Sequence, residues 1–143
     1  STGLTSVLVD FVSAGGNLMI FPGVNANKEV YNSLLGLLNA NTINTFTKGE
    51  KQVGKLNAYS FVFSNVFSKI SRNIQLPKTT SSYGVNVSQS RAMEEILTYR
   101  DGSPYLSKYT LGRGATYLCS APLNKTYNDL SANAEIFIPL LYI

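Results

Sequence analysis

The sequence predicts an α/β fold in which a layered sheet, covered by helices, ends in a C-terminal antiparallel meander. Residues 4–39 read as helix, glycine stop, apolar strand, tight turn and second helix, the order of elements in an α/β unit. Residues 93–120 read as three short strands separated by turn residues, which is typical of an antiparallel meander. The length of 143 residues and the lack of a linker favour a single domain over residues 1–143.

The first predicted helix stops at a glycine pair and leads into a strand. Apolar side chains recur in it at the spacing of one helical face, namely Leu4, Val7, Leu8, Phe11 and Val12. Gly15 and Gly16 follow, and glycine adopts the left-handed backbone that a helix exit needs. Residues 17–21 are a short run without polar alternation, as expected for a strand that is covered on both faces. We therefore expect this strand at the centre of the sheet.

A second helix is predicted from Lys28 to Asn39, after the turn that begins at Pro22 and Gly23. Asn25 and Asn27 lie just before its start, and an asparagine side chain can accept a hydrogen bond from the free backbone N–H groups there. One side of this helix is apolar and carries Val30, Tyr31, Leu34, Leu37 and Leu38. This helix is expected to pack on the sheet through that side.

The middle of the chain has weaker signals. Residues 40–55 predict a polar loop with a short strand over 43–47 and a second one after it. Aromatic residues alternate over 59–63, which favours extended chain, and apolar residues over 66–70 have the spacing of one or two helical turns. Residues 79–90 are rich in serine and are expected to be the most mobile part of the chain.

The last third of the sequence predicts three strands and a helix. The strands are expected at 93–99, 104–110 and 115–120, with turns at Asp101-Gly102 and Gly112-Arg113-Gly114. Residues 93–99 would also suit a helix, but the Asp-Gly turn that follows them favours a strand. A final helix is expected from about Ala134, with Pro139 tolerated only in its first turn.

Composition and charge argue against a nucleic-acid partner. The net charge is +4, but the twelve Lys and Arg residues are dispersed and form no dense basic cluster. Only 14% of the residues are charged, below the usual quarter, so the surface relies on Asn, Ser, Thr and Tyr. Such a surface is more common in envelope or secreted proteins than in cytosolic enzymes.

The sequence predicts no catalytic site, metal site or cofactor. It contains no histidine, which removes Ser-His-Asp and Cys-His pairs and most transition-metal sites. Cys119 is the only cysteine, so an internal disulfide is impossible, and its apolar segment predicts a buried thiol. Glu94 and Glu95 are neighbours on a predicted strand and point to opposite faces, so they cannot act together on one substrate. They are expected to be solvated edge residues.

The turn at residues 22–27 is the one candidate ligand-binding site. Pro22, Gly23, Asn25 and Asn27 follow a strand and lead into a helix, the place where doubly wound sheets bind ligands. One interpretation is a plain turn with an asparagine cap; the other is a site for a small sugar or anion at the helix start. None of these residues is a nucleophile.

Several segments together resemble one family. Residues 8–23, with Phe11-Val12, Gly15-Gly16 and Pro22-Gly23, resemble a motif of class I glutamine amidotransferase-like domains, in particular those of BatA-like (aerotolerance regulator type) membrane proteins of Bacteroidetes. Residues 111–124, Asn128-Asp129-Leu130 and Phe137-Ile138-Pro139-Leu140 resemble later segments of the same domains. The resemblance spans most of the chain in the same order.

This resemblance implies a flavodoxin-like sheet on the periplasmic side of a membrane-anchored protein, with a transmembrane helix shortly after Ile143. It does not carry over amidotransferase activity, since the elbow holds Pro22, Gly23 and Val24 in place of a cysteine. We therefore expect a non-catalytic interaction or ligand-binding domain, excised from a longer membrane protein, with other envelope proteins as partners. Alternatively, the segment is part of an enzyme whose catalytic residues lie outside it.

Overall fold

The computed structural model describes residues 2–57, 60, 62–63, 75–88 and 92–143. Six strands form one sheet in the order β1-β6-β5-β4-β2-β3. The strands are β1 (Asn17–Ile20), β2 (Thr42–Leu56), β3 (Lys78–Asn86), β4 (Met93–Tyr99), β5 (Pro104–Leu111) and β6 (Gly114–Cys119). The helices are α1 (Thr2–Ser13), α2 (Lys28–Leu37) and α3 (Ala134–Leu141), with a short 3₁₀ turn at Leu130–Ala132 before α3.

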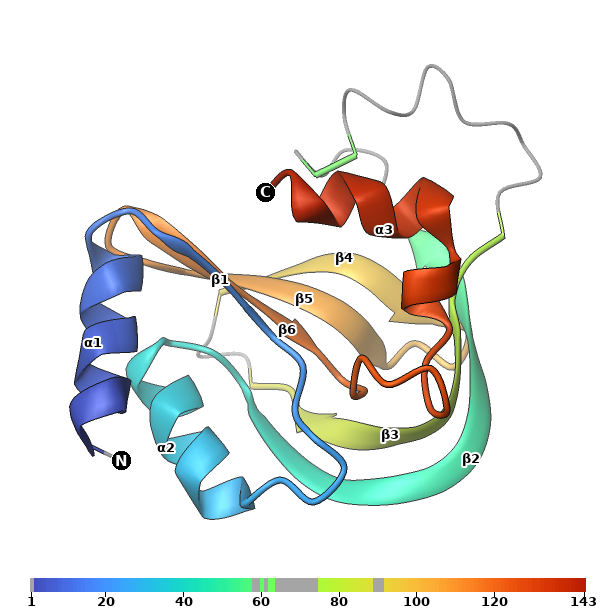
Figure 1. Cartoon of the computed structure of the whole chain (residues 1–143), viewed down its shortest axis with the longest axis horizontal. Helices are drawn as coiled ribbons and strands as arrows, with labels where there is room; N and C mark the ends of the chain where they lie inside the picture. The colour runs from blue at the N-terminus through green and yellow to red at the C-terminus, as the bar shows by residue number, and fades with distance from the viewer. Residues whose placement is uncertain (1, 58–59, 61, 64–74, 89–91) are drawn as a thin grey trace.

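The sheet curls into a half-barrel, and the long strand β2 makes most of the curve (Figure 1). β2 pairs with β3 along one edge and with β4 along the other. Its register against β3 shifts twice, between Ile43 and Phe46 and between Lys48 and Lys51, and its register against β4 shifts between Val53 and Lys55. Such irregularities bend a strand and increase its twist, so β2 serves both ends of the curled sheet.

The prediction of a flavodoxin-like, glutamine amidotransferase-like layered α/β fold is wrong. Among the described strands, β1 and β6 form the parallel pair, and every other pairing is antiparallel. A doubly wound sheet needs repeated helical crossovers that return parallel strands beside the first one. Here the chain leaves α2 for β2, on the far side of the meander, and the fold is mostly β.

The apolar strand β1 lies at the edge of the sheet and not at its centre. Among the described residues it pairs with β6 alone. Leu18 and Ile20 nevertheless pack in the apolar cluster beneath α1 and α2, whereas Met19 and Phe21 pack in the cluster beneath α3. The uninterrupted apolar run of β1 therefore indicates that both faces of the strand are covered. It does not indicate whether the strand lies at the edge or at the centre of the sheet.

The two faces of the sheet carry separate apolar cores. One core joins α1 and α2 to the sheet through fully buried residues such as Val12, Leu35 and Leu118. The other lies under α3 and includes Tyr105 and Tyr117. Figure 1 shows α1 and α2 together at one end of the sheet and α3 on the opposite side.

Local signals at the two ends of the chain are confirmed. Gly15 ends α1 with a φ of +122°, and the Asn27 side chain accepts a hydrogen bond from the Val30 N–H at 3.2 Å as the N-cap of α2. The three strands of the meander, β4, β5 and β6, are joined by the predicted turns, in which Gly102 and Gly112 both have positive φ. Turn chemistry thus sets this half of the topology.

Other local predictions are wrong. The strand expected over 43–47 and the one expected after it both belong to the continuous strand β2, so no polar loop separates them, and the segment expected to be mobile contains β3. Pro139 lies beyond the first turn of α3. Glu94 and Glu95 belong to β4, an inner strand, and not to an edge. The predicted helical turn at 66–70 lies outside the described residues, as do residues 59 and 61 of the segment expected to be extended, whereas Val62 and Phe63 of that segment form a turn.

Candidate functional site

The predicted ligand turn is held in place by a tyrosine from a distant strand. The Tyr83 hydroxyl, on β3, donates a hydrogen bond to the Gly23 carbonyl oxygen at 2.5 Å. The same hydroxyl lies 3.3 Å from the Val24 carbonyl oxygen and 3.4 Å from the Ala26 backbone nitrogen, which donates to it. The Tyr83 hydroxyl therefore contacts three backbone polar groups of this turn.

The four predicted site residues are brought together on this turn but play different parts. Pro22 is buried, while Gly23 and Asn25 are exposed. Asn27 uses its side-chain oxygen as the cap of α2. The plain-turn interpretation accounts for all of these contacts, and ligand binding at residues 22–27 stays a prediction.

An apolar groove lies between α1, β1 and α2 at this end of the molecule. It has a volume of about 420 Å³. Its lining residues are Leu4, Thr5, Leu8, Leu18, Met19, Ile20, Phe21, Val30, Tyr31 and Leu34. We call this feature the α1–β1–α2 groove.

Apolar side chains on the helices around this groove face solvent. Leu4, Val7 and Phe11 of α1 are 59%, 63% and 52% exposed, and Val30 and Leu37 of α2 are also more than half exposed. The sequence places the α1 residues on a single apolar face, yet of that face only Val12 is buried and Leu8 is half-buried. A helix face of this kind is ordinarily buried, but in this structure most of its apolar surface is open to solvent.

The groove carries little charge. Asp10 is the single charged residue of α1, and Lys28 and Glu29 are the charged residues of α2. Within the part of the chain that the structure describes, no helix is both long and apolar enough to cross a membrane. The groove is thus an apolar surface without a basic rim.

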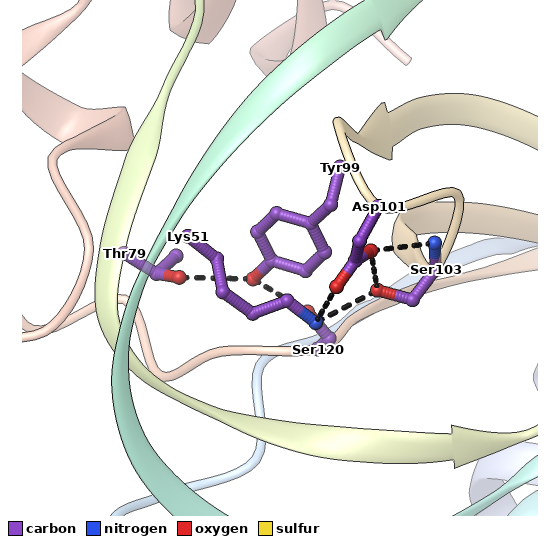
Figure 2. Close-up of polar contacts among 6 residues, drawn as sticks. All are labelled: Lys51, Thr79, Tyr99, Asp101, Ser103 and Ser120. Carbon is purple, nitrogen blue, oxygen red and sulfur yellow. Dashed lines mark hydrogen bonds and ion pairs between the residues drawn. The ribbon is translucent and has the colours of Figure 1, made fainter.

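A polar cluster joins β2, β3, the β4–β5 hairpin and Ser120, the residue after β6 (Figure 2). The hydroxyl of Tyr99 lies 3.1 Å from Thr79 Oγ1 and 3.0 Å from Ser120 Oγ, and all three residues are buried. Burial raises the pKa of Tyr99 to about 12, although its two hydroxyl partners oppose that shift. Lys51 Nζ lies 4.4 Å from the centre of the Tyr99 ring, within range of a cation–π contact.

The rim of the same cluster is an ion pair built on the hairpin turn. Lys51 Nζ lies 3.0 Å from Asp101 Oδ2 and donates to Ser103 Oγ at 2.7 Å. Asp101 Oδ1 accepts hydrogen bonds from the hydroxyl and the backbone N–H of Ser103. These bonds to Ser103, and then Lys51, lower the pKa of Asp101 to about 2. The carboxylate, although half exposed, forms a structural clasp between β2 and the hairpin.

Cys119 has the environment of a structural thiol. It is fully buried, and burial raises its pKa to about 12. Its polar neighbours are Asn128, whose amide nitrogen lies 3.9 Å from the sulfur, and Tyr105, which donates a hydrogen bond to the Asn128 oxygen at 2.8 Å. Within the described ranges, no group of three His, Cys, Asp or Glu residues is placed to hold a metal ion.

Comparison with known proteins shows the fold alone. No family model matches the chain, and no curated protein matches it. The chain is similar to the solved structure of the cytoplasmic protein STM3548 from Salmonella typhimurium, at 11% identity and a TM-score of 0.66, over 96% of this chain and 58% of that one. It is also similar to a β-galactosidase from Rahnella sp. R3, at 15% identity and a TM-score of 0.63, over 98% of this chain and 20% of the enzyme.

A third similar structure is the cytoplasmic protein STM1381 from Salmonella typhimurium LT2, at 12% identity and a TM-score of 0.58, over 85% of this chain and 50% of that one. The chain therefore spans about half the length of the two Salmonella proteins and about one fifth of the β-galactosidase. These neighbours agree with the β-rich half-barrel, and none of the three is described as a flavodoxin or a glutamine amidotransferase.

Two features that stand out in the structure, the α1–β1–α2 groove and the clasp of Lys51 on Asp101, were not predictable from the sequence. The periodicity of α1 was visible, but periodicity identifies an apolar face without saying whether the chain itself covers it. The clasp of Lys51 on Asp101 joins residues 50 positions apart, and no local pattern signals that pairing. The Asp101-Gly102 dipeptide indicated only the turn.

Proposed function

We propose that residues 1–143 form a non-catalytic interaction domain that docks on another folded protein domain through the α1–β1–α2 groove. The observation that carries the proposal is the exposed apolar face of α1 beside the edge strand β1. Contiguous apolar surface of this kind on a folded protein is typical of a binding site for another protein. An edge strand also offers unpaired backbone groups that a partner can use.

A protein fits this groove better than a lipid surface does. Helices that lie on anionic membranes carry Lys and Arg along their polar face. α1 contains no basic residue, and Asp10 gives it a negative charge, while Lys28 and Glu29 of α2 offset each other. The apolar, nearly uncharged surface is the kind that a domain interface requires.

The fold comparisons support a role within a larger assembly. A fold that covers 98% of this chain takes up only 20% of the Rahnella β-galactosidase, so in that protein the fold is accompanied by other parts of a much longer chain. The absence of histidine, the ion pair of Asp101 with Lys51 and the burial of Cys119 support a non-catalytic role. We further propose that the domain lies in the cell envelope, on the periplasmic side of a membrane-anchored protein. The weakly charged surface and the sequence resemblance support this location.

Site-specific photocrosslinking in the full-length protein tests this proposal. A photoreactive p-benzoylphenylalanine replaces Leu4 in one variant and Val30 in a second, and Val87 in a control of similar exposure outside the groove. We expect both groove positions to crosslink to peptides of one folded domain, and the Val30→Lys substitution to abolish the crosslink from position 4. Crosslinks to lipid alone, or a pattern equal to that of the Val87 control, would overturn the proposal.

A further inference from the structure

A second cavity lies where the β4–β5 hairpin meets β2, and it shares no lining residue with the α1–β1–α2 groove. Its volume is about 400 Å³, which is within the range of small-molecule sites. Polar and charged residues dominate its lining, among them Lys55, Glu95, Thr98 and Arg100. We propose that this cavity binds a small oxyanion, the carboxylate or phosphate group of a ligand, through Arg100 and Lys55.

The balance of charge in the cavity favours an anion. Arg100 and Lys55 contribute two positive charges, and Glu95 contributes the one carboxylate of the lining. Neither cation makes an ion pair among the described residues, where Lys51 pairs with Asp101 and Lys78 pairs with Glu50. Asp101 of the hairpin and Glu50 of β2 therefore already have a cationic partner, and the lining of the cavity keeps an excess of one positive charge.

The backbone of Arg100 is held beside the cavity by β2, and a glycine leaves room for its exposed side chain. Its N–H donates to the Gln52 carbonyl oxygen at 3.0 Å, which ties the first residue after β4 to β2. A Cβ atom added to Gly54 would lie 2.5 Å from Arg100 Cγ and 3.2 Å from Arg100 Cα. The missing side chain of Gly54 thus provides the space that the Arg100 side chain occupies.

Lys55 comes to the same cavity through a local irregularity of the sheet. Lys55 and Thr98 are cross-strand partners just past the point where the register of β2 against β4 shifts. Thr98, which is buried and lines the cavity, carries a hydroxyl that can donate to an oxyanion. A guanidinium group, an ammonium group and a hydroxyl together match the donors that carboxylates and phosphates use in proteins.

Titration followed by NMR tests this proposal on the full 143-residue chain. Inorganic phosphate and acetate serve as separate probes, with sodium chloride at matched ionic strength as the reference. We expect saturable shifts of the Gly54 and Gly102 amides and of the Arg100 side-chain N–H with at least one probe. The probe that binds more tightly identifies whether phosphate or carboxylate is the better ligand group.

Substitutions of the charged lining residues test whether they bind the anion. We expect Arg100→Gln and Lys55→Gln each to weaken binding at least tenfold, and Glu95→Gln to strengthen it two- to threefold. Lys125→Gln, an exposed lysine outside the cavity, is the matched control and should leave binding unchanged. The proposal is overturned if neither probe gives saturable shifts, or if Arg100→Gln and Lys125→Gln have the same effect in proteins with unchanged amide spectra.

Discussion

The hydroxyl of Tyr99 links three parts of the sheet, so its removal is a direct test of the polar cluster. Tyr99→Phe keeps the ring and the contact with Lys51 but leaves Thr79 Oγ1 and Ser120 Oγ without that partner. Both of these residues are fully buried. Two buried hydrogen bonds of about 1 kcal/mol each are lost, so the free energy of unfolding should fall by about 2 kcal/mol at pH 7.

The same variant has a pH signature that a simple packing defect lacks. In the wild type the pKa of Tyr99 is about 12 in the folded state against 10.0 in the unfolded state. The folded state favours the neutral form of Tyr99. Its contribution to the free energy of unfolding is therefore complete below pH 10 and is lost as the pH rises from 10 towards 12. At pH 10.5 the free energy of unfolding of the wild type is lower by about 0.8 kcal/mol because of Tyr99 ionisation in the unfolded state. The Tyr99→Phe variant has no such loss. The deficit of Tyr99→Phe should therefore shrink from about 2 to about 1 kcal/mol.

Urea denaturation at pH 7 and pH 10.5, followed by circular dichroism, measures both numbers. Tyr105 and Cys119 also have raised pKa values, but they are present in both proteins and their effects cancel in the difference. Tyr142→Phe is the matched control, because Tyr142 is 85% exposed and its substitution should change stability by less than about 0.5 kcal/mol at either pH. A deficit that is below about 0.5 kcal/mol at pH 7, or that does not change with pH, would refute the reasoning.

Four further predictions concern the ion pair of Asp101 and the packing of Gly114, Cys119 and Leu35. Asp101, whose pKa is lowered to about 2, stabilises the fold above pH 4, and this contribution should disappear as the pH falls from 4 to 2 in acid titrations of the wild type but not of Asp101→Asn. Gly114→Ala should unfold at much lower urea concentration than the wild type, because the added Cβ would lie 2.0 and 2.2 Å from two backbone carbonyl oxygens of α1 and the turn after it. Cys119 should react with a thiol reagent in urea but not in buffer, whereas reaction within minutes in buffer would contradict its burial. Leu35→Ala should cost about 3 kcal/mol in the same denaturation assay, and Leu37→Ala, at an exposed position of the same helix, less than about 1 kcal/mol.

The local elements were predictable because their signals are local. The Asn27 cap, the Gly15 helix exit and the turns of the meander depend on residues within a few positions of one another. The arrangement of these elements was not predictable in the same way. Residues 17–21 look the same at the edge of a sheet as at its centre, because helices on both faces bury alternate side chains in either place.

The long strand β2 was missed for a related reason. Its residues Thr42–Leu56 are mostly polar, and at two places its register against β3 shifts, so the usual alternation of apolar and polar residues is broken. The candidate sites show the same limit. Arg100 and Lys55, like Lys51 and Asp101, are distant in sequence and meet only because β2 pairs with β4.

Hydrogen exchange in the backbone of α1 and β1 tests the central claim most directly, namely that this end of the sheet is a docking surface. The measurement compares residues 3–21 in the 143-residue chain purified alone with the same residues in the natural protein purified together with its partners. We expect exchange at least tenfold slower for these residues in the natural protein, with unchanged rates in β4 and β5. Equal rates in the two samples would show that nothing covers the groove and would contradict the account.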